Sequence, residues 1–374
     1  MTLLEVRDLN VSFPTADGVV RAVRGVSFEV EPGRTLGIVG ESGSGKTVLT
    51  QTLLGLTPGA EVSGSALFEG TDLFELSDDE MRHVRGERIS VIFQDPLTSL
   101  HPLYRIGWQI SEMIRAHEKS VSKKEAHVRS VDLLRKVGIP KPETRVNDYP
   151  HQFSGGMRQR AMIAMALALD PKLIIADEPT TALDATVQAQ ILDLLLRLQQ
   201  DLGTALIMIT HDLGVVADIA DDVMVMYAGR AAEKAAKRDV FYAAHHPYTK
   251  GLLESIPSSK AAGGRLKPIP GSPPSLINLP SGCKFHPRCG YVFDKCLAEE
   301  PVLHPVAETG SHTSACWLPA NAAGLSAEAE ELRDQVVAAE RGEEAAEVAA
   351  SARAEFGVST PENAATGDNE GSVA

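Results

Sequence analysis

A glycine-rich stretch near the N-terminus constrains the fold more than any other feature of this chain. It runs from Gly40 to Thr47 with the sequence GESGSGKT, and it matches the pattern G-x-x-x-x-G-K-[ST] of phosphate-binding loops. The apolar segment 36–39 before it predicts a strand, and the segment 48–54 after it predicts a helix. A strand, a glycine-rich turn and a helix in this order predict an α/β fold that binds a nucleoside triphosphate at the helix N-terminus.

Each residue type in this loop suits a phosphate. Glycines let the backbone wrap the phosphates, so that several N–H groups point at the oxygen atoms. Lys46 is expected to reach the β- and γ-phosphates, and the Thr47 hydroxyl to be a ligand of Mg²⁺. The loop residues predicted to bind ATP are Gly40, Ser42, Gly43, Ser44, Gly45, Lys46 and Thr47. The alternative is a chance glycine-rich turn, which the flanking strand and helix disfavour.

Two acidic residues follow a second apolar run. Segment 173–176 and segment 205–209 are continuously apolar, which is typical of parallel strands buried on both faces. The first of them ends in Asp177, expected in the Mg²⁺ shell, and Glu178, expected to orient or deprotonate the attacking water. Such a pair is often only the start of a solvated loop, so the interpretation depends on the phosphate loop.

The segment 153–160, FSGGMRQR, resembles the signature motif of ATP-binding-cassette (ABC) ATPases, with Phe and Met where Leu and Gln are commoner. In that family the serine and glycines of the motif cap a helix and present N–H groups to the γ-phosphate of ATP on the opposite subunit. The resemblance therefore implies that Ser154, Gly155 and Gly156 serve the partner's ATP.

Further motifs of the same family occur in the expected order. The resemblance implies that Gln94 contacts Mg²⁺ and the transporter, that Asp184 lies at the dimer interface, and that His211 lies near the γ-phosphate. It also implies that Phe13 stacks on adenine, although an aromatic residue in a strand is as readily a core residue. Gln94 or His211 alone would be an ordinary turn or structural residue, and the combination favours the catalytic interpretation. Glu178, His211 and Lys46 are the predicted catalytic residues.

The resemblance to the cassette covers about residues 4–235 and implies an α/β fold. Its parts are a P-loop, RecA-like ABC ATPase core, an antiparallel β subdomain and an α-helical subdomain, with a small cysteine-containing C-terminal extension. The predicted boundaries are 1–95 and 154–235 for the core, 96–153 for the helical subdomain, 236–319 for the C-terminal extension and 320–374 for an Ala- and Glu-rich, disordered tail. Residues 257–282 are rich in Pro, Gly and Ser and suggest an extended linker.

Three further stretches, 95–102, 246–253 and 269–289, are similar to the ATPase subunits of dipeptide, oligopeptide and nickel importers. That branch implies a second ATPase subunit, often a different chain, two membrane-spanning permease subunits and an extracytoplasmic substrate-binding protein. The region 95–105 would then lie where the permease docks. Peptide uptake driven by ATP and Mg²⁺ is the expected function, and uptake of nickel or another small solute is the alternative.

All four cysteines, Cys283, Cys289, Cys296 and Cys316, lie in one late segment. Their wide spacing lacks the C-x-x-C pattern that structural zinc sites usually contain, and four thiolates with wide gaps can hold a [4Fe–4S] cluster. A Cys₄ zinc site is the main alternative, and disulfides or free buried thiols are the others. His286, His304 and His312 are candidate substitute ligands.

Charge and hydropathy limit the remaining possibilities. The net charge is −14, which disfavours a nucleic acid as the main partner. No apolar stretch reaches membrane-spanning length and the N-terminus lacks a signal-peptide layout, so we expect a peripheral protein at the cytoplasmic face of the membrane, held by the permease.

A soluble ABC ATPase acting on DNA or ribosomes is disfavoured because the interval between Gly40 and Ser154 has no room for a coiled-coil arm. The intact Lys46, Asp177, Glu178 and His211 disfavour a non-catalytic regulatory subunit.

Overall fold

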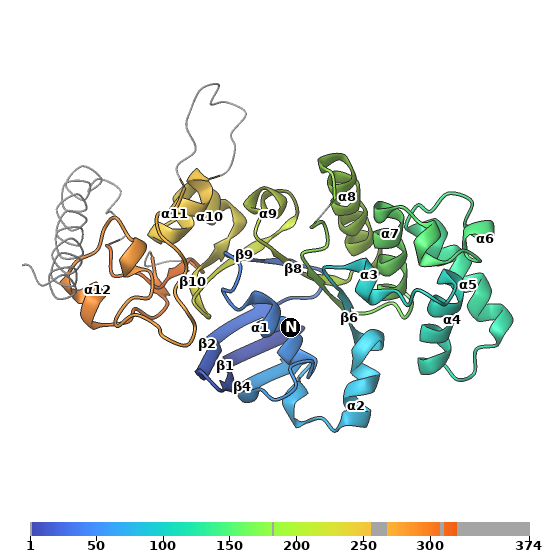
Figure 1. Cartoon of the computed structure of the whole chain (residues 1–374), viewed down its shortest axis with the longest axis horizontal. Helices are drawn as coiled ribbons and strands as arrows, with labels where there is room; N and C mark the ends of the chain where they lie inside the picture. Colours follow the sequence, from blue (N-terminus) through green and yellow to red (C-terminus); the bar gives the residue numbers. More distant parts are fainter. Residues whose placement is uncertain (1, 182, 256–267, 307–309, 320–374) are drawn as a thin grey trace, which may run out of the picture. The chain divides into compact units, whose positions relative to one another are not determined.

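The computed structural model describes residues 2–181, 183–255, 268–306 and 310–319 (Figure 1). The chain divides into two units, residues 1–320 and 321–374. The predicted disordered tail, residues 320–374, lies outside the described residues, and so do residues 257–267 of the predicted linker.

The smaller of two sheets is antiparallel and has the strand order β2-β1-β4-β5. Its strands are β1 (Leu4–Thr15), β2 (Gly18–Val30), β4 (Glu61–Phe68) and β5 (Thr71–Asp72). The central strand β1 pairs with β2 and with β4. Apolar side chains at Leu4, Val6, Leu9 and Val11 are buried, so one face of this sheet belongs to the core.

The larger sheet has the order β11-β12-β10-β9-β3-β8-β7-β6. Its strands are β3 (Thr35–Val39), β6 (Ile89–Ile92), β7 (Leu173–Asp177), β8 (Ala205–Thr210), β9 (Asp222–Tyr227), β10 (Arg230–Ala236), β11 (His304–Pro305) and β12 (Thr313–Ser314). The five strands β9, β3, β8, β7 and β6 are parallel. The prediction of buried parallel strands at 173–176 and 205–209 is confirmed, because every residue of β7 and β8 is buried.

Helices connect these strands and cover the sheet. They are α1 (Lys46–Leu53), α2 (Asp78–His83), α3 (Pro96–Ser99), α4 (Ile106–His117), α5 (Lys123–Lys136), α6 (Pro142–Arg145), α7 (Gly155–Ala166), α8 (Ala185–Leu202), α9 (Leu213–Ile219), α10 (Lys237–Ala243), α11 (Pro247–Glu254) and α12 (Asp294–Ala298). Single turns of 3₁₀-helix lie at 73–75, 150–152 and 286–288, and a π-helical turn lies at 84–88. Among the described residues, no helix is both long and apolar enough to span a bilayer.

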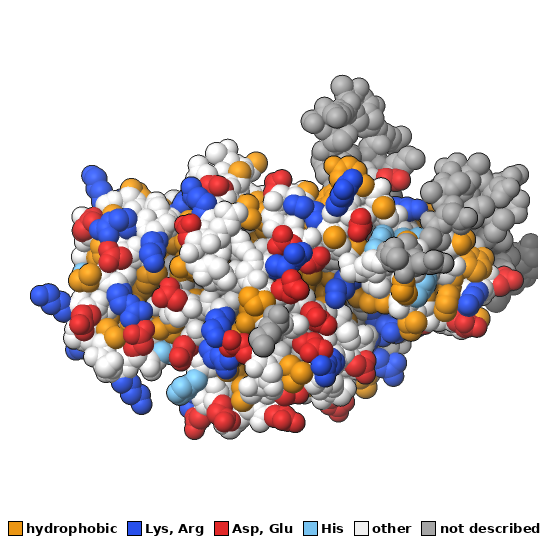
Figure 2. All heavy atoms as spheres, turned by 180° about the vertical axis from the view of Figure 1, so that it is seen from behind, with side chains coloured by type: hydrophobic (Ala, Val, Ile, Leu, Met, Phe, Trp, Pro, Cys, Tyr) orange, Lys and Arg blue, Asp and Glu red, His pale blue; other side chains and the backbone are white. Residues whose placement is uncertain are grey.

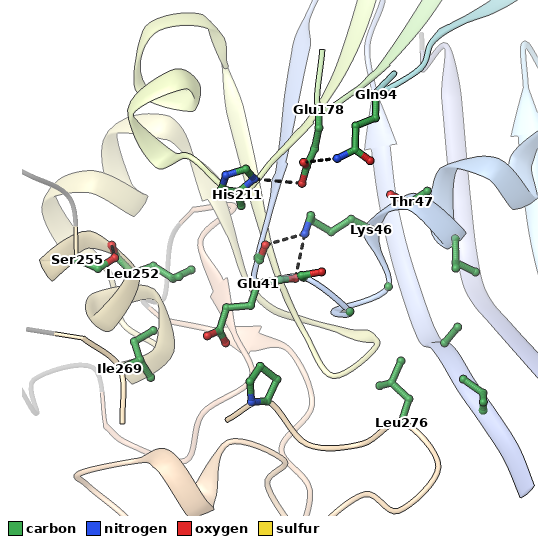
Figure 3. Close-up of a pocket in the computed structure, with 18 of the residues that line it drawn as sticks. Glu41, Lys46, Thr47, Gln94, Glu178, His211, Leu252, Ser255, Ile269 and Leu276 are labelled. Carbon is green, nitrogen blue, oxygen red and sulfur yellow. Dashed lines mark hydrogen bonds and ion pairs between the residues drawn. The ribbon is translucent and has the colours of Figure 1, made fainter. Parts of the chain in front are cut away.

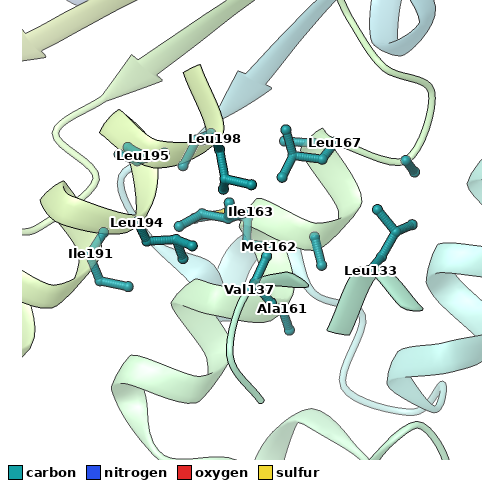
Figure 4. Packing of buried hydrophobic residues seen from close by; sticks show 14 of the residues in the cluster. Leu133, Val137, Ala161, Met162, Ile163, Leu167, Ile191, Leu194, Leu195 and Leu198 are labelled. Atoms are coloured by element: carbon teal, nitrogen blue, oxygen red, sulfur yellow. The ribbon is translucent and has the colours of Figure 1, made fainter. Parts of the chain in front are cut away.

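The largest hydrophobic cluster joins α4, α5, α7 and α8 to the sheet. Figure 4 shows Ile163 of α7 beside Leu194 and Leu198 of α8. Within residues 96–153, which the sequence predicts to be helical, α4 and α5 bury Ile110, Ile114 and Leu134 completely. Val128 of α5 is 52% exposed.

The C-terminal extension has a core of its own, built around Tyr248 and Phe285. Both side chains are buried against β9 and β10, and Ile269, Leu276 and Leu279 pack on the same cluster. The described part of the predicted linker is therefore packed structure. On the face drawn in Figure 2, acidic and basic side chains are interspersed.

Candidate functional site

A cleft of about 1070 Å³ lies at the carboxyl ends of the parallel strands (Figure 3). The phosphate loop follows β3, Gln94 follows β6, Glu178 follows β7 and His211 follows β8. Because these strands are parallel neighbours, the residues that follow them reach the same edge of the sheet. All four contributions line this one cleft.

The phosphate loop needs glycine at its end for steric reasons. Gly45, directly before α1, has φ of +100°, and a Cβ there would lie 2.3 Å from the carbonyl oxygen of Ala22. No other residue type could hold this backbone position. The side-chain oxygen of Ser44 is buried without a hydrogen-bond partner among the described residues, as expected of a polar atom that belongs to an oxyanion site.

Lys46 begins α1 and its side chain folds back over the loop. Its Nζ donates hydrogen bonds to the backbone oxygens of Gly40, at 2.7 Å, and Glu41, at 3.0 Å. Burial lowers the pKa of Lys46, and the nearby carboxylates of Glu178 and Asp177 oppose that effect. A buried ammonium group at the start of a helix attracts phosphate strongly.

Thr47 and Asp177 are oxygen donors that could hold a divalent cation. The Thr47 hydroxyl donates to Oδ1 of Asp177 at 3.1 Å, which joins the start of α1 to the end of β7. Burial raises the pKa of Asp177, and a cation beside the carboxylate would offset that cost. Two hard oxygen donors of this kind fit Mg²⁺, which takes its remaining ligands from water and phosphate.

The structure brings Gln94 and His211, both predicted site residues, together at the carboxylate of the predicted Glu178. Oε2 of Glu178 accepts hydrogen bonds from Gln94 Nε2 at 3.1 Å and from the Thr181 hydroxyl at 2.9 Å. Oε1 lies 3.2 Å from Nδ1 of His211. Figure 3 shows Gln94, Glu178 and His211 on the same side of Lys46. Thr181 was not singled out from the sequence, and nothing but its place three residues after Glu178 could have indicated it.

The predicted signature residues lie elsewhere. Ser154 is the N-cap of α7, where its side chain accepts from the Met157 N–H, and Asp184 is the N-cap of α8. Gly155 and Gly156 form the first turn of α7. Neither the signature residues nor Asp184 line the cleft, so they are not placed to serve a nucleotide bound there.

Phe13 lines the cleft together with Val20, its partner in the β1–β2 ladder. Its side chain is half-buried, and it also packs on the core formed by the smaller sheet. Both interpretations of Phe13 are thus compatible with its position.

Arg288 is a residue that the sequence analysis did not single out. Its guanidinium bonds both carboxylate oxygens of Glu41 in the phosphate loop, at 2.6 and 3.0 Å. Burial alone would lower the pKa of Arg288, but its hydrogen bonds to Glu41 and Tyr227 raise it overall. No sequence pattern connects Glu41 with a residue so far along the chain.

The predicted iron–sulfur cluster at the cysteines is wrong. The four thiols line one small cavity, but within residues 2–181, 183–255, 268–306 and 310–319 no three Cys, His, Asp or Glu side chains form a group that could hold a metal ion. Burial raises the pKa of all four thiols, and that of Cys289 and Cys316 to about 12. The zinc alternative also needs at least three such ligands around one point, which the described residues do not provide, and the same holds for the substitute ligands.

Comparisons with known proteins agree with this geometry. The family described as "ABC transporter" matches residues 23–181, and the family described as "Oligopeptide/dipeptide transporter, C-terminal region" matches residues 232–296. The oligopeptide transport ATP-binding protein OppD of Bacillus subtilis is 53% identical over 320 residues, covering 84% of this chain and 88% of that protein. The dipeptide transport ATP-binding protein DppD of Lactococcus lactis is 50% identical over 318 residues, covering 84% and 90%.

Solved structures support the fold. A dimeric ATP-binding cassette in a post-hydrolysis state, bound to ADP and Pi, is similar with a TM-score of 0.57 and 26% identity, covering 63% of this chain and 99% of that one. The protein cbiO1 from Clostridium perfringens, part of the ABC transporter complex cbiONQ, has a TM-score of 0.56 and 30% identity, covering 64% of this chain and 90% of that one. The predicted fold class, an ABC ATPase with mixed α/β sheets, is confirmed.

Proposed function

The chain belongs to the ABC transporter family, in the branch of oligopeptide and dipeptide transport ATP-binding proteins, and from this premise we propose that it hydrolyses ATP to drive peptide uptake. The convergence of Lys46, Gln94, Glu178 and His211 on one cleft carries the proposal. Each follows a different strand of the larger sheet. Lys46 supplies an ammonium group for the phosphates, and Glu178 supplies a carboxylate that Gln94 and His211 hold by hydrogen bonds.

In this assignment Lys46 and the loop backbone bind the β- and γ-phosphates. Thr47, Asp177 and Gln94 are the residues that would hold Mg²⁺, which neutralises phosphate charge when bound. Glu178 orients the attacking water and accepts its proton, since its carboxylate lies beside the cleft with free acceptor capacity. Gln94 and His211 fix the rotamer of Glu178 by bonding one oxygen each.

The active unit is proposed to be a pair of ATPase subunits. The N–H groups at the start of α7, which Ser154 caps, are oriented donors suited to a phosphate. Because they do not line the cleft of their own chain, the ATP they serve is the one bound by a second subunit. Asp184, at the start of α8, belongs to the same contact surface. The second subunit is the same chain or a related one.

A second cleft is the proposed docking site of the permease. It has a volume of about 920 Å³ and an apolar lining that includes Leu54, Phe93, Met113 and Met162. Gln94 lines the nucleotide cleft, whereas its neighbour Phe93 lines this one. A shift of the segment after β6 would therefore move Gln94 in the nucleotide cleft and Phe93 in the second cleft together. Such a shift would couple the nucleotide site to the permease, as transport requires. Attachment through this cleft would hold the chain at the cytoplasmic face of the membrane.

Peptide uptake is preferred over nickel uptake because the relatives matched over 84% of this chain are peptide transport proteins. The test is uptake by the organism's own cells with a chromosomal Glu178→Gln substitution. Uptake of labelled di- and oligopeptides should fall to background while nickel uptake is unchanged. Loss of nickel uptake with intact peptide uptake would contradict the substrate assignment.

Copurification tests the partners. The tagged chain should recover two permease subunits, and a soluble complex without membrane subunits would contradict the transport role.

A further inference from the structure

One end of the nucleotide cleft is apolar and includes part of the C-terminal extension. Ile269, Pro273 and Leu276 line the cleft there, and we call these three residues the base wall. The same cleft is lined by Phe13 and Val20 of the smaller sheet. In Figure 3, Ile269 and Leu276 lie on the side of Lys46 opposite to Glu178 and His211.

Backbone contacts fix the base wall against the cassette. The carbonyl oxygen of Leu276 accepts a hydrogen bond from the N–H of Arg21 in β2 at 3.2 Å. Ile269 packs directly on α11, where a Cβ at Gly251 would lie only 2.8 Å from its Cγ1. The base wall is thus held at both of its ends, by a strand on one side and a helix on the other.

A single side chain ties this segment to the phosphate loop. Nε of Arg288 donates to the carbonyl oxygen of Pro270 at 2.8 Å, while its two terminal nitrogens bond Glu41. The Arg288 side chain is only 4% exposed. Such a buried, bidentate guanidinium has little rotational freedom, so the spacing between the phosphate loop and the base wall is set.

We infer that the base wall binds the purine ring of the nucleotide, an inference that rests on the proposed function. Phosphates held at Lys46 and Thr47 leave the base at the far end of the cleft, where the lining is apolar. A planar base buries its faces favourably on such side chains. The side chains of Ile269, Pro273 and Leu276 carry no hydrogen-bonding group. They recognise the ring by shape, so adenine and guanine should bind to them with similar strength.

The test measures binding of ATP and of inorganic tripolyphosphate to the full-length chain by calorimetry. Replacing Ile269 and Leu276 together by Ala removes buried contacts with the base and should weaken ATP binding about tenfold or more. Tripolyphosphate has no base, so its affinity should stay unchanged, and this shows that the variant is folded. Ile277→Ala is the matched control, because Ile277 lies against Gly18 and does not line the cleft. GTP should displace ATP from the wild-type chain.

Three outcomes would count against these ideas in different ways. Unchanged ATP affinity in the double variant would overturn the base wall while leaving the proposed function intact. An equal loss of ATP and tripolyphosphate affinity would also overturn it, because the segment would then act only through the fold. A wild-type chain that binds neither ATP nor tripolyphosphate would refute the proposed function itself.

Discussion

Glu178 has a backbone conformation that few residues other than glycine adopt. Its φ is +46°, and its N–H donates to the carbonyl oxygen of Ile209 in β8. Such strain persists only where surrounding contacts impose it, and it is concentrated at functional sites. Here the hydrogen bonds from Gln94 and Thr181 hold the carboxylate at the cleft.

Replacing Glu178 with Gln should separate binding from hydrolysis. The amide keeps the size of the side chain but cannot accept a proton, so turnover should fall by roughly 10²- to 10⁴-fold. ATP affinity should stay within about a factor of three, because the phosphate contacts of Lys46 and the loop are untouched. Binding is measured by calorimetry on the chain and hydrolysis by phosphate release from the assembled transporter. Wild-type turnover would remove Glu178 from its assigned role.

Individual residues of the nucleotide site could be predicted because they are tied to strand ends. The phosphate loop follows β3, and Glu178 and His211 follow β7 and β8, so parallel pairing alone brings them to one edge. Arg288 could not be predicted, because its bond to Glu41 depends on how the C-terminal extension packs. The cysteine spacing suggested a metal site that the described residues do not form. The spacing was misleading because it carries no information on burial or on how the thiols are arranged in space.

At the scale of elements, Arg288 connects the 3₁₀ turn 286–288 to the phosphate loop. Arg288→Ala leaves the Glu41 carboxylate, which is 27% exposed, without its partner. The cost in the free energy of unfolding should therefore lie between that of an exposed pair, about 1 kcal/mol, and that of a fully buried one, about 3–5 kcal/mol. Urea denaturation of the full chain measures this loss. ATP affinity should fall as well, because Glu41 and the base wall lose their common anchor.

Arg135→Ala is the matched control for Arg288→Ala. Arg135 also contacts two carboxylates, those of Asp132 and Glu143, but its side chain is 54% exposed. Exposed pairs contribute at most about 1 kcal/mol, so this variant should be almost as stable as the wild type. Arg288→Lys should recover part of the stability, since it keeps the charge but not the bidentate geometry. Equal effects of Arg135→Ala and Arg288→Ala would show that the buried pair has no special weight.

The base wall shows why composition misleads at the scale of a segment. Residues 257–282 are rich in Pro, Gly and Ser, a composition typical of linkers. Yet Ile269 and Leu276 are spaced for two separate contacts, one on α11 and one beside β2. Extended chain that packs on a surface has no period, so its apolar residues give no helical or strand signal.

Protonation of His246 should make the C-terminal extension sensitive to acid. The imidazole is buried at the N-cap of α11, where Nδ1 accepts from the Tyr248 N–H at 3.0 Å. Burial lowers its pKa to about 4, even though the nearby Glu233 favours the charged form. Between about pH 6.5 and 4 the unfolded chain therefore binds a proton that the folded chain does not. Stability should fall with decreasing pH by up to about 1.4 kcal/mol per unit.

His246→Asn tests this assignment. Asn keeps a side-chain oxygen for the N-cap but does not titrate, so its free energy of unfolding should depend less steeply on pH between 6.5 and 5. The measurement is urea denaturation of both chains across that range. His245 and Glu233 titrate nearby and are present in both chains, so their contribution cancels in the comparison. Identical slopes would show that His246 is not the group responsible.

At the scale of the whole molecule, the predicted signature residues do not line the nucleotide cleft of their own chain. They sit where α7 and α8 approach closely, since a Cβ at Gly156 would lie 2.8 Å from Cγ1 of Val187. Close packing of this kind fixes the direction of the α7 N-terminus relative to α8 and Asp184. A rigid donor surface outside the nucleotide cleft of its own chain supports our proposal that hydrolysis needs a second subunit.

Ser154→Ala and Ser122→Ala form a matched pair that tests this requirement. Both serines are helix N-caps whose side chains accept from the N–H three residues later. Each substitution should therefore cost about 1 kcal/mol of stability. Only Ser154→Ala removes a group facing the partner's ATP, so hydrolysis by the assembled transporter should fall about 10²-fold or more in that variant alone. ATP binding by the separate chain should be the same in both. If Ser154→Ala instead weakened ATP binding by the separate chain, Ser154 would serve its own nucleotide, and the two-subunit site would be wrong.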